Sequence, residues 1–297
     1  MNSETNTMFE EKEIRVKKTS AFLTTVKRLS RNKLAVVGMV ITVLLVLMAI
    51  FAPLIMPYEY DYSDFRATFA KPGPGHVFGT DELGRDILSR LMYGARYSLQ
   101  IGIFSVAGAL VGGVVLGSVA GYFGGWVGNL IMRFLDILQA IPGMVMAIAI
   151  SSVLGPGFEN CILALMISMI PSFARMMRAS ILNVRKMEYL EAATSINCRN
   201  FRIILKHVLP NAMSPIIVQA TMSVPMSILI AATLSFIGLG VQPPVPEWGA
   251  MLTAGRNYIR DYPHLVLFPG LMIMIAVLSL NMFGDGLRDA LDPKLKD

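Results

Sequence analysis

Glu191-Ala192-Ala193 and Leu209-Pro210-Asn211 bracket a short polar-to-basic run that lies between two long apolar segments. The residues from Met187 to Ile196 are mostly good helix formers, and Asn197 tolerates the left-handed backbone conformation in which many helices end. A second short helix is predicted from Arg199 to Leu209, where the following proline interrupts it. The stretch therefore predicts two short helices joined by a turn at a membrane surface.

The second of these helices has two faces, and they leave two interpretations open. Its apolar side chains share one face, and its cations share another, namely Arg199, Arg202 and Lys206. One interpretation is a docking elbow for a partner protein. The other is an interfacial loop whose cations reach lipid headgroups. Periodicity alone does not choose between them.

The composition is that of a protein that crosses a membrane several times. Of the 297 residues, 54% are hydrophobic and only 15% are charged, and the mean hydropathy is +0.58, far above what a soluble core requires. The fold class is predicted to be an all-α integral membrane protein. Six transmembrane helices are expected, each long enough to cross about 30 Å of hydrocarbon, near residues 34–56, 99–121, 130–153, 160–178, 212–238 and 265–286.

The distribution of Lys and Arg predicts the orientation of the chain. The N-terminal arm, the 175–207 loop and the C-terminal tail carry most of these cations, whereas the 57–97 and 239–264 loops carry few. Both termini and the elbow are therefore expected in the cytoplasm. This asymmetry accounts for the net charge of +6 and disfavours nucleic-acid binding as its cause.

Four parts follow from these segments. A cytoplasmic arm at 1–33 precedes a first transmembrane helix and outer loop at 34–98. A core of five transmembrane helices follows at 99–290 and contains the elbow loop at about 179–211. A cytoplasmic tail occupies 291–297. The outer loop is predicted to hold an amphipathic helix capped by Thr80 that lies along the outer surface and ends at Gly94.

Glycines recur at every fourth position along the second predicted span. The spacing lets another helix approach the backbone closely, so the favoured interpretation is a packing seam, and the alternative is a hinge that flexes during transport. The residues concerned are Gly113, Gly117, Gly121 and Gly125.

Few charges fall inside the predicted spans. Arg133 and Asp136 are three residues apart and are expected to neutralise each other on one helix face. A proton relay would show deeper and more numerous acids, so a proton-driven carrier is disfavoured. The histidines His76, His207 and His264 are scattered over loops without a second ligand at metal spacing, so no metal site is expected.

The later outer loop, residues 242–249, is rich in proline and carries an indole at Trp248. An amphipathic indole suits a membrane interface, so this loop is expected to anchor in headgroups or to meet a partner.

The elbow resembles the EAA loop of ABC importer permeases in its glutamate, paired alanines and terminal Leu-Pro. Three further stretches resemble the C-type permease of dipeptide and oligopeptide importers, and together the marks cover about residues 25–295. They are Phe78-Gly79-Thr80-Asp81-Glu82-Leu83-Gly84-Arg85-Asp86, then Gly238-Leu239-Gly240 with Pro243-Pro244 and Trp248-Gly249, and Gly284-Asp285-Gly286-Leu287-Arg288-Asp289-Ala290-Leu291-Asp292-Pro293.

The resemblance implies a type I ABC importer permease fold with a cytoplasmic coupling helix, in a bacterial inner membrane. It implies a homologous second permease, two cytoplasmic ATPases that bind ATP and Mg, and an extracytoplasmic solute-binding protein that delivers a peptide. This chain would then bind no cofactor and catalyse no reaction. Contacts with the ATPases would fall on Glu191, Ala192, Ala193, Asn197, Arg199, Leu209 and Pro210, and contacts of the outer loops on Asp81, Arg85, Asp86, Pro244 and Trp248.

Two positions depart from the family's EAA pattern. Asn197 stands where glycine is usual, a mild change because asparagine also tolerates the left-handed conformation. His207 stands where isoleucine is frequent, which brings a titratable side chain near the expected ATPase interface.

The mechanistic hypothesis is that the segment from Met187 to Lys206 inserts its first helix into an ATPase groove and acts as a rigid lever on the fourth and fifth spans. The alternatives are a self-sufficient secondary transporter or channel, and a membrane enzyme such as a peptidase. The first predicts inverted repeats or clustered intramembrane acids, and the second predicts a catalytic motif such as HExxH or GxSxG. The sequence shows none of these, and no Gly-x4-Gly-Lys-Ser/Thr loop. Relatives with these marks transport peptides, nickel, haem or glutathione, and the sequence assigns no substrate-binding residue.

Overall fold

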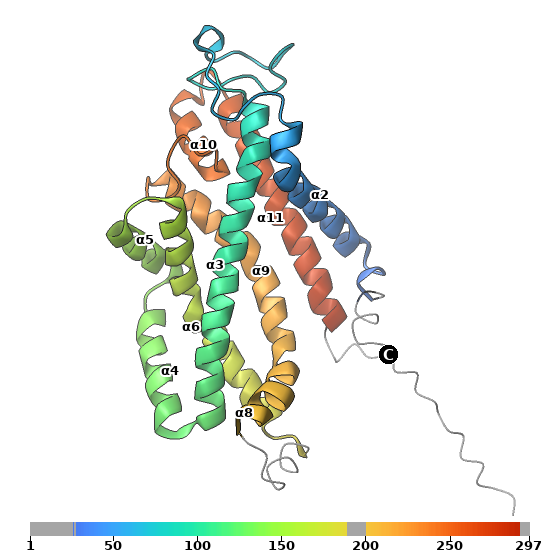
Figure 1. The fold of residues 1–297 in the computed structure, drawn as a ribbon, viewed down its shortest axis with the longest axis vertical. Helices are drawn as coiled ribbons and strands as arrows, with labels where there is room; N and C mark the ends of the chain where they lie inside the picture. Colours follow the sequence, from blue (N-terminus) through green and yellow to red (C-terminus); the bar gives the residue numbers. More distant parts are fainter. Residues whose placement is uncertain (1–25, 27, 189–199, 292–297) are drawn as a thin grey trace, which may run out of the picture.

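The computed structural model describes residue 26, residues 28–188 and residues 200–291. Within these ranges the chain is a helical bundle (Figure 1). Short helical turns occur at Phe65–Ala67, Ile204–Val208 and Arg256–Tyr258. The α-helices are α2 (Lys33–Ile55), α3 (Ile87–Phe123), α4 (Gly125–Gln139), α5 (Gly143–Leu154), α6 (Phe158–Val184), α8 (Asn200–Ile203), α9 (Leu209–Phe236), α10 (Trp248–Gly255) and α11 (His264–Leu291).

Five helices of the described chain are long and apolar enough to cross a membrane, namely α2, α3, α6, α9 with the helical turn before it, and α11. The span predicted near 130–153 is not one continuous helix. This region consists of α4 and α5, which meet at a bend of 86°. Pro142 precedes α5 and lacks a backbone N–H, and a proline also disfavours helical conformation in the residue before it, so Pro142 favours a break here. Proline alone does not force the break, because α6 and α9 continue through Pro171 and Pro225. The described chain therefore has five continuous spans, or six if this bent pair is counted as one broken span.

The bundle is organised around α3, the longest helix. α3 packs most extensively against α6 and also contacts α9, while α11 lies between α2 and α9. The buried side chains of α3, α6 and α9 form one apolar cluster, and those of α2, α3, α10 and α11 form another. α10 and the loop between α2 and α3 cover one end of the bundle, whereas α8 lies at the other (Figure 1).

The glycine seam joins α3 to α6. A Cβ atom at Gly113 would overlap the Phe173 side chain, and one at Gly117 would overlap the Ala174 carbonyl oxygen. At Gly121 the added atom would lie 3.1 Å from Ile181 Cβ. These three positions support close helix packing. The prediction is wrong for Gly125, which follows the end of α3 at a positive φ of 53° and has open space around its Cβ position.

The helix that the sequence predicted from Thr80 begins instead at Ile87. Asp86 caps it, because its carboxylate accepts hydrogen bonds from the Ser89 amide at 2.8 Å and the Ser89 hydroxyl at 2.7 Å. The preceding stretch turns twice in the left-handed region, at Gly79 and Gly84, so it cannot be helical. The helix is not a surface element that ends at Gly94 but the first part of α3, and the predicted boundary at residues 98/99 falls inside α3.

Candidate functional site

Most residues of the predicted docking elbow lie outside the described residues. These are Glu191, Ala192, Ala193, Asn197 and Arg199, so their role stays a prediction. Leu209 and Pro210 are described, together with the turn that precedes them.

The second arm of the elbow continues into α9. Pro210 was expected to interrupt a helix, and that expectation is wrong, because α9 runs from Leu209 through Pro210 to Phe236 directly after a helical turn. The five residues before α9 form a π-helical turn, closed by a hydrogen bond from the Leu209 amide to the Ile204 carbonyl. Asn211 Nδ2 also donates to the His207 carbonyl at 2.7 Å. Movement of this arm must therefore move the start of α9.

The described part of the arm has a buried face and an exposed face. Ile203 and Val208 are buried and belong to the apolar cluster that contains Ile181 and Val184 of α6. The exposed face carries Arg202, Leu205 and Lys206. Leu205 is 47% exposed and has a cation on either side. The arm is thus fixed to α6 and presents an apolar side chain with a basic surround to the solvent.

A cavity of about 640 Å³ opens near the same end of the bundle. It lies between the first turns of α9, the last turn of α11 and one residue of α6, so its walls come from distant parts of the sequence. Its lining mixes apolar side chains with amide, hydroxyl and guanidinium groups, and consists of Met176, Asn211, Ser214, Pro215, Val218, Gln219, Met222, Arg288 and Leu291. Its volume falls within the usual range for small-molecule sites.

Asp136 of α4 pairs with Arg175 of α6, not with Arg133 as the sequence predicted. The Arg175 Nη2 atom donates to Asp136 Oδ1 at 2.8 Å. The helix spacing brings Arg133 near Asp136 along α4, but α6 packs against α4 and supplies a closer cation. Both paired side chains are about half exposed. Insertion scales give roughly 2.5 to 3.5 kcal/mol for one charge at a bilayer centre, so the placement of this pair requires an explanation.

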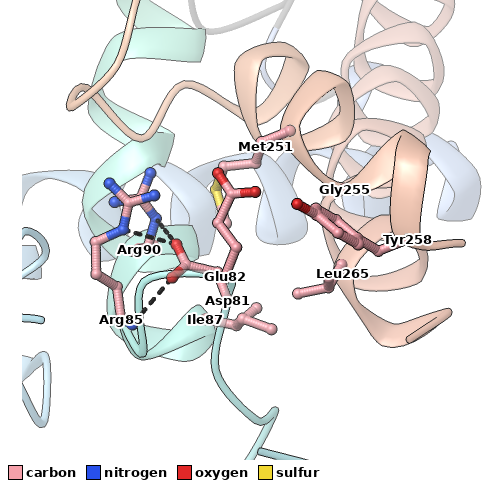
Figure 2. A pocket seen from close by; sticks show the side chains of 10 residues that line it. Asp81, Glu82, Arg85, Ile87, Arg90, Met251, Gly255, Tyr258 and Leu265 are labelled. Atoms are coloured by element: carbon pink, nitrogen blue, oxygen red, sulfur yellow. Dashed lines mark hydrogen bonds and ion pairs between the residues drawn. The ribbon is translucent and has the colours of Figure 1, made fainter. Parts of the chain in front are cut away.

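The outer end carries a buried cluster of one acid and two arginines (Figure 2). Asp81 Oδ2 accepts a hydrogen bond of 2.7 Å from Arg85 Nε and lies 3.5 Å from Arg90 Nε. Asp81 Oδ1 also accepts from the Arg85 amide at 3.0 Å. Figure 2 shows Glu82 and Tyr258 on the other side of the small pocket beside this cluster. A hydrogen bond to the Glu82 carboxylate raises the pKa of Tyr258.

The outer contact residues predicted from sequence are mostly internal. Arg85 and Asp86 are buried, and Asp86 Oδ1 lies 2.9 Å from His76 Nδ1. Trp248 was expected to meet lipid or a partner, but it is fully buried, and its indole N–H donates to the Leu91 carbonyl at 3.0 Å. Pro244 is exposed, so of these five residues it remains the best placed for an outer contact.

Glu247 is a buried carboxylate that the sequence analysis missed. It caps α10 by accepting from the Gly249 and Ala250 amides, both at 2.8 Å. It also accepts hydrogen bonds from Ser98 of α3 at 3.1 Å and Ser235 of α9 at 2.9 Å. Glutamate is not one of the usual N-cap residues, so the sequence offers no capping signal here, and the links of Glu247 to α3 and α9 depend on tertiary structure. Among the described residues no group of three or more His, Cys, Asp or Glu side chains could hold a metal ion.

Residues 113–297 match the family described as the binding-protein-dependent transport system inner membrane component. The chain belongs to this permease family. Residues 20–72 of the permease match the N-terminal transmembrane domain of oligopeptide transport permease C.

The permease is similar to curated transport proteins along nearly its whole length. It is 49% identical to the dipeptide transport system permease protein DppC of Alkalihalophilus pseudofirmus, over 91% of this chain and 89% of the relative. It is 46% identical to the glutathione transport system permease protein GsiD of Escherichia coli, again over 91% of this chain and 89% of the relative. The family match over residues 113–297 includes the predicted docking elbow.

A solved structure shows the same fold at low sequence identity. The permease resembles a chain of the MetNI methionine ABC transporter in an inward-facing conformation, with a TM-score of 0.55 and 19% identity. The match covers 68% of this permease and 96% of that chain. The fold is therefore that of a type I ABC importer permease, with additional residues outside the shared core.

Proposed function

We propose that this permease forms one half of the pathway through which an ATP-driven importer moves short peptides into a bacterial cell. The observation that carries the proposal is the 49% identity to a dipeptide transport permease over 91% of the chain. The arrangement of the bundle supports it, because the elbow arm and the 640 Å³ cavity lie at one end and the capped loops lie at the other.

The proposed assembly contains four further subunits. A homologous permease supplies the second half of the pathway, two cytoplasmic ATPases bind ATP and Mg, and an extracytoplasmic binding protein delivers the peptide. This chain binds no nucleotide and hydrolyses none. Both of its termini lie in the cytoplasm, in agreement with the excess of Lys and Arg in the terminal arms and the elbow loop.

The elbow is the proposed docking site for an ATPase. Glu191, Ala192 and Ala193 would lie in the helix that enters the ATPase groove, and Arg202, Leu205 and Lys206 would lie beside it. The described arm packs on α6 and runs into α9 without a flexible joint. Closure of the ATPases would then be transmitted to both helices as a rigid-body displacement.

Glutathione is a second candidate substrate, because a glutathione transport permease is 46% identical to this chain. Glutathione is itself a short peptide with free carboxylates and an amino group, so the two candidates share one chemistry. The alternative from another class, a self-sufficient secondary carrier, needs neither ATPases nor a binding protein.

The experiment is purification of the tagged permease from native membranes in mild detergent. Mass spectrometry of the accompanying proteins and an ATPase assay of the eluate then test the assembly. We expect a second permease and two P-loop ATPases, and their loss in the Glu191→Arg variant. Recovery of the permease alone, with transport after reconstitution and no need for ATP, would refute the proposal in favour of the secondary carrier.

A further inference from the structure

The ion pair between Asp136 and Arg175 lies deep within the span that it occupies. Arg175 is only about 6 Å along the axis from the middle of α6, at 1.5 Å per residue. The span predicted at 160–178 ends three residues beyond Arg175, so the pair lies in the inner half of a hydrocarbon layer about 30 Å thick and not in the 175–207 loop in which the sequence analysis counted Arg175. The two side chains are nevertheless 53% and 51% exposed on this chain. Lipid is a poor environment for such a pair, so water or protein must cover it.

A second feature at the same place points to water. The break between α4 and α5 begins just after Asp136, and Ala140, Ile141 and Pro142 at the break are all exposed. Irregular backbone at membrane depth is tolerated where it is buried in protein or lines a water-filled cavity. An exposed break and an exposed ion pair on one surface therefore face either water or the proposed second permease, and not lipid alone.

The local electrostatics disfavour a negative charge at Asp136. Its carboxylate lies in the last turn of α4, where the helix dipole is negative and disfavours an acid. Arg175 offsets this effect, and the exposed Arg133 one turn earlier leaves the surface with an excess positive charge. An exposed ion pair contributes little net stability, so exchange of either partner for another charge of the same sign is easy.

We propose that Asp136 and Arg175 line the water-filled translocation pathway and separate to receive the charged termini of a passing peptide. Asp136 would accept hydrogen bonds from the peptide ammonium group, and Arg175 would donate to its terminal carboxylate in a bidentate pair. The peptide as occupant rests on the proposed function, whereas the exposure of the pair to water does not.

Cysteine labelling tests the exposure to water. Single cysteines are placed at Asp136 and Arg175 in the assembled transporter, in a Cys161→Ala and Cys198→Ser background. A charged, membrane-impermeant thiosulfonate reacts with the thiolate, which forms in water and not in lipid. Leu44→Cys is the matched control, because Leu44 is at mid-span in α2 and 58% exposed. We expect both test positions to react at least about tenfold faster than the control. Equal rates at all three positions would overturn the proposal.

Uptake measurements test whether Asp136 and Arg175 bind a passing peptide. Asp136→Asn and Arg175→Gln should each lower the maximal rate of ATP-dependent dipeptide uptake by about tenfold, the size of effect expected when a charge-assisted contact is lost. The half-saturating dipeptide concentration should not change, because the binding protein sets capture, and recovery of the complete complex should equal that of the wild type. Normal uptake in both variants, or a loss that only parallels a loss of complex, would overturn the role assigned to the pair.

The two proposals can fail separately. A wild-type complex without ATP-dependent peptide uptake would refute the proposed function and remove the peptide as occupant. The labelling rates would still decide whether the pair faces water. Wild-type uptake with slow labelling at Asp136→Cys and Arg175→Cys would refute only the inference.

Discussion

Glu247 accepts a hydrogen bond of 2.9 Å from the hydroxyl of Ser235, across the loop that joins α9 to α10. The other Glu247 oxygen accepts from Ser98 of α3, so one buried carboxylate connects three helices. Gly240 lies in the same loop, and a Cβ atom there would overlap the Ser235 side chain. Glu247 therefore ties α3, α9 and α10 together at the outer end of the bundle.

Glu247→Gln is predicted to destabilise the outer end. The amide NH2 of glutamine would face donors where a carboxylate oxygen now accepts, which leaves buried polar groups unpaired at a cost of about 1–3 kcal/mol. Thermal unfolding of the purified complex measures the effect. Glu59→Gln is the control, because Glu59 is exposed in the outer loop. An equal melting temperature for both variants would show that the four hydrogen bonds of Glu247 contribute little.

Asp81→Asn is predicted to be more damaging. Among the residues that Figure 2 shows, Asp81 is the acid that pairs with Arg85 and Arg90, and both arginines are buried. The substitution removes this negative charge. Loss of one partner from a buried ion pair costs about 3–5 kcal/mol, because the remaining charge is uncompensated. The yield of folded permease and its melting temperature provide the measurement. Glu59→Gln, at an exposed position, should behave as the wild type. A wild-type melting temperature for Asp81→Asn would contradict the assigned role of the cluster.

Gly117→Ala is predicted to separate α3 from α6. The added methyl group would overlap the Ala174 carbonyl oxygen, and overpacking of this kind costs about 1–3 kcal/mol. We expect a lower melting temperature together with reduced transport. Gly143→Ala is the matched control, because no atom lies within 4 Å of its Cβ position. If Gly117→Ala lost transport at full stability, the hinge interpretation of the glycines would be preferred.

Leu205→Asp is predicted to weaken ATPase docking without unfolding the permease. Leu205 is 47% exposed on the elbow arm between Arg202 and Lys206, so an acid there removes an apolar contact and reduces the basic charge. We expect recovery of the ATPases to fall by at least about tenfold, as for a central interface residue. Arg66→Glu in the outer loop, at the opposite end of the bundle, should leave recovery unchanged. Full ATPase recovery with Leu205→Asp would place the docking surface elsewhere.

Hydrophobicity was sufficient to locate five of the spans, because long apolar helices such as α2 and α11 have few alternatives in a membrane. It was insufficient for the third span. Apolar residues continue on both sides of Pro142, and hydropathy does not record the backbone direction that a proline imposes. The start of α3 was misplaced for a similar reason. Thr80 and Asp86 are both good capping residues, and only the left-handed Gly84 between them decides which one is used.

The candidate sites show the same contrast between what local sequence predicts and what tertiary packing decides. The second arm of the elbow could be predicted because its sequence is local and continuous, and the helical register placed Arg202 and Lys206 on its exposed face. The first helix of the elbow lies outside the described residues and stays a prediction. The partners of Asp136 and Trp248 were missed because they come from other helices. Arg133 is near Asp136 in sequence, but tertiary packing brings Arg175 closer. The indole suited an interface, yet Leu91 offered its N–H a buried acceptor.

The continuity of α3 sets how far the outer end stands above the membrane. The span predicted at 99–121 leaves residues 87–98 of α3 on the outer side, and at 1.5 Å per residue they extend about 18 Å beyond the hydrocarbon layer. The first turns of α3 carry the loop between α2 and α3 and contact α10. A soluble protein could therefore rest on this raised platform without its own surface touching the headgroups, and would need no membrane affinity to reach it.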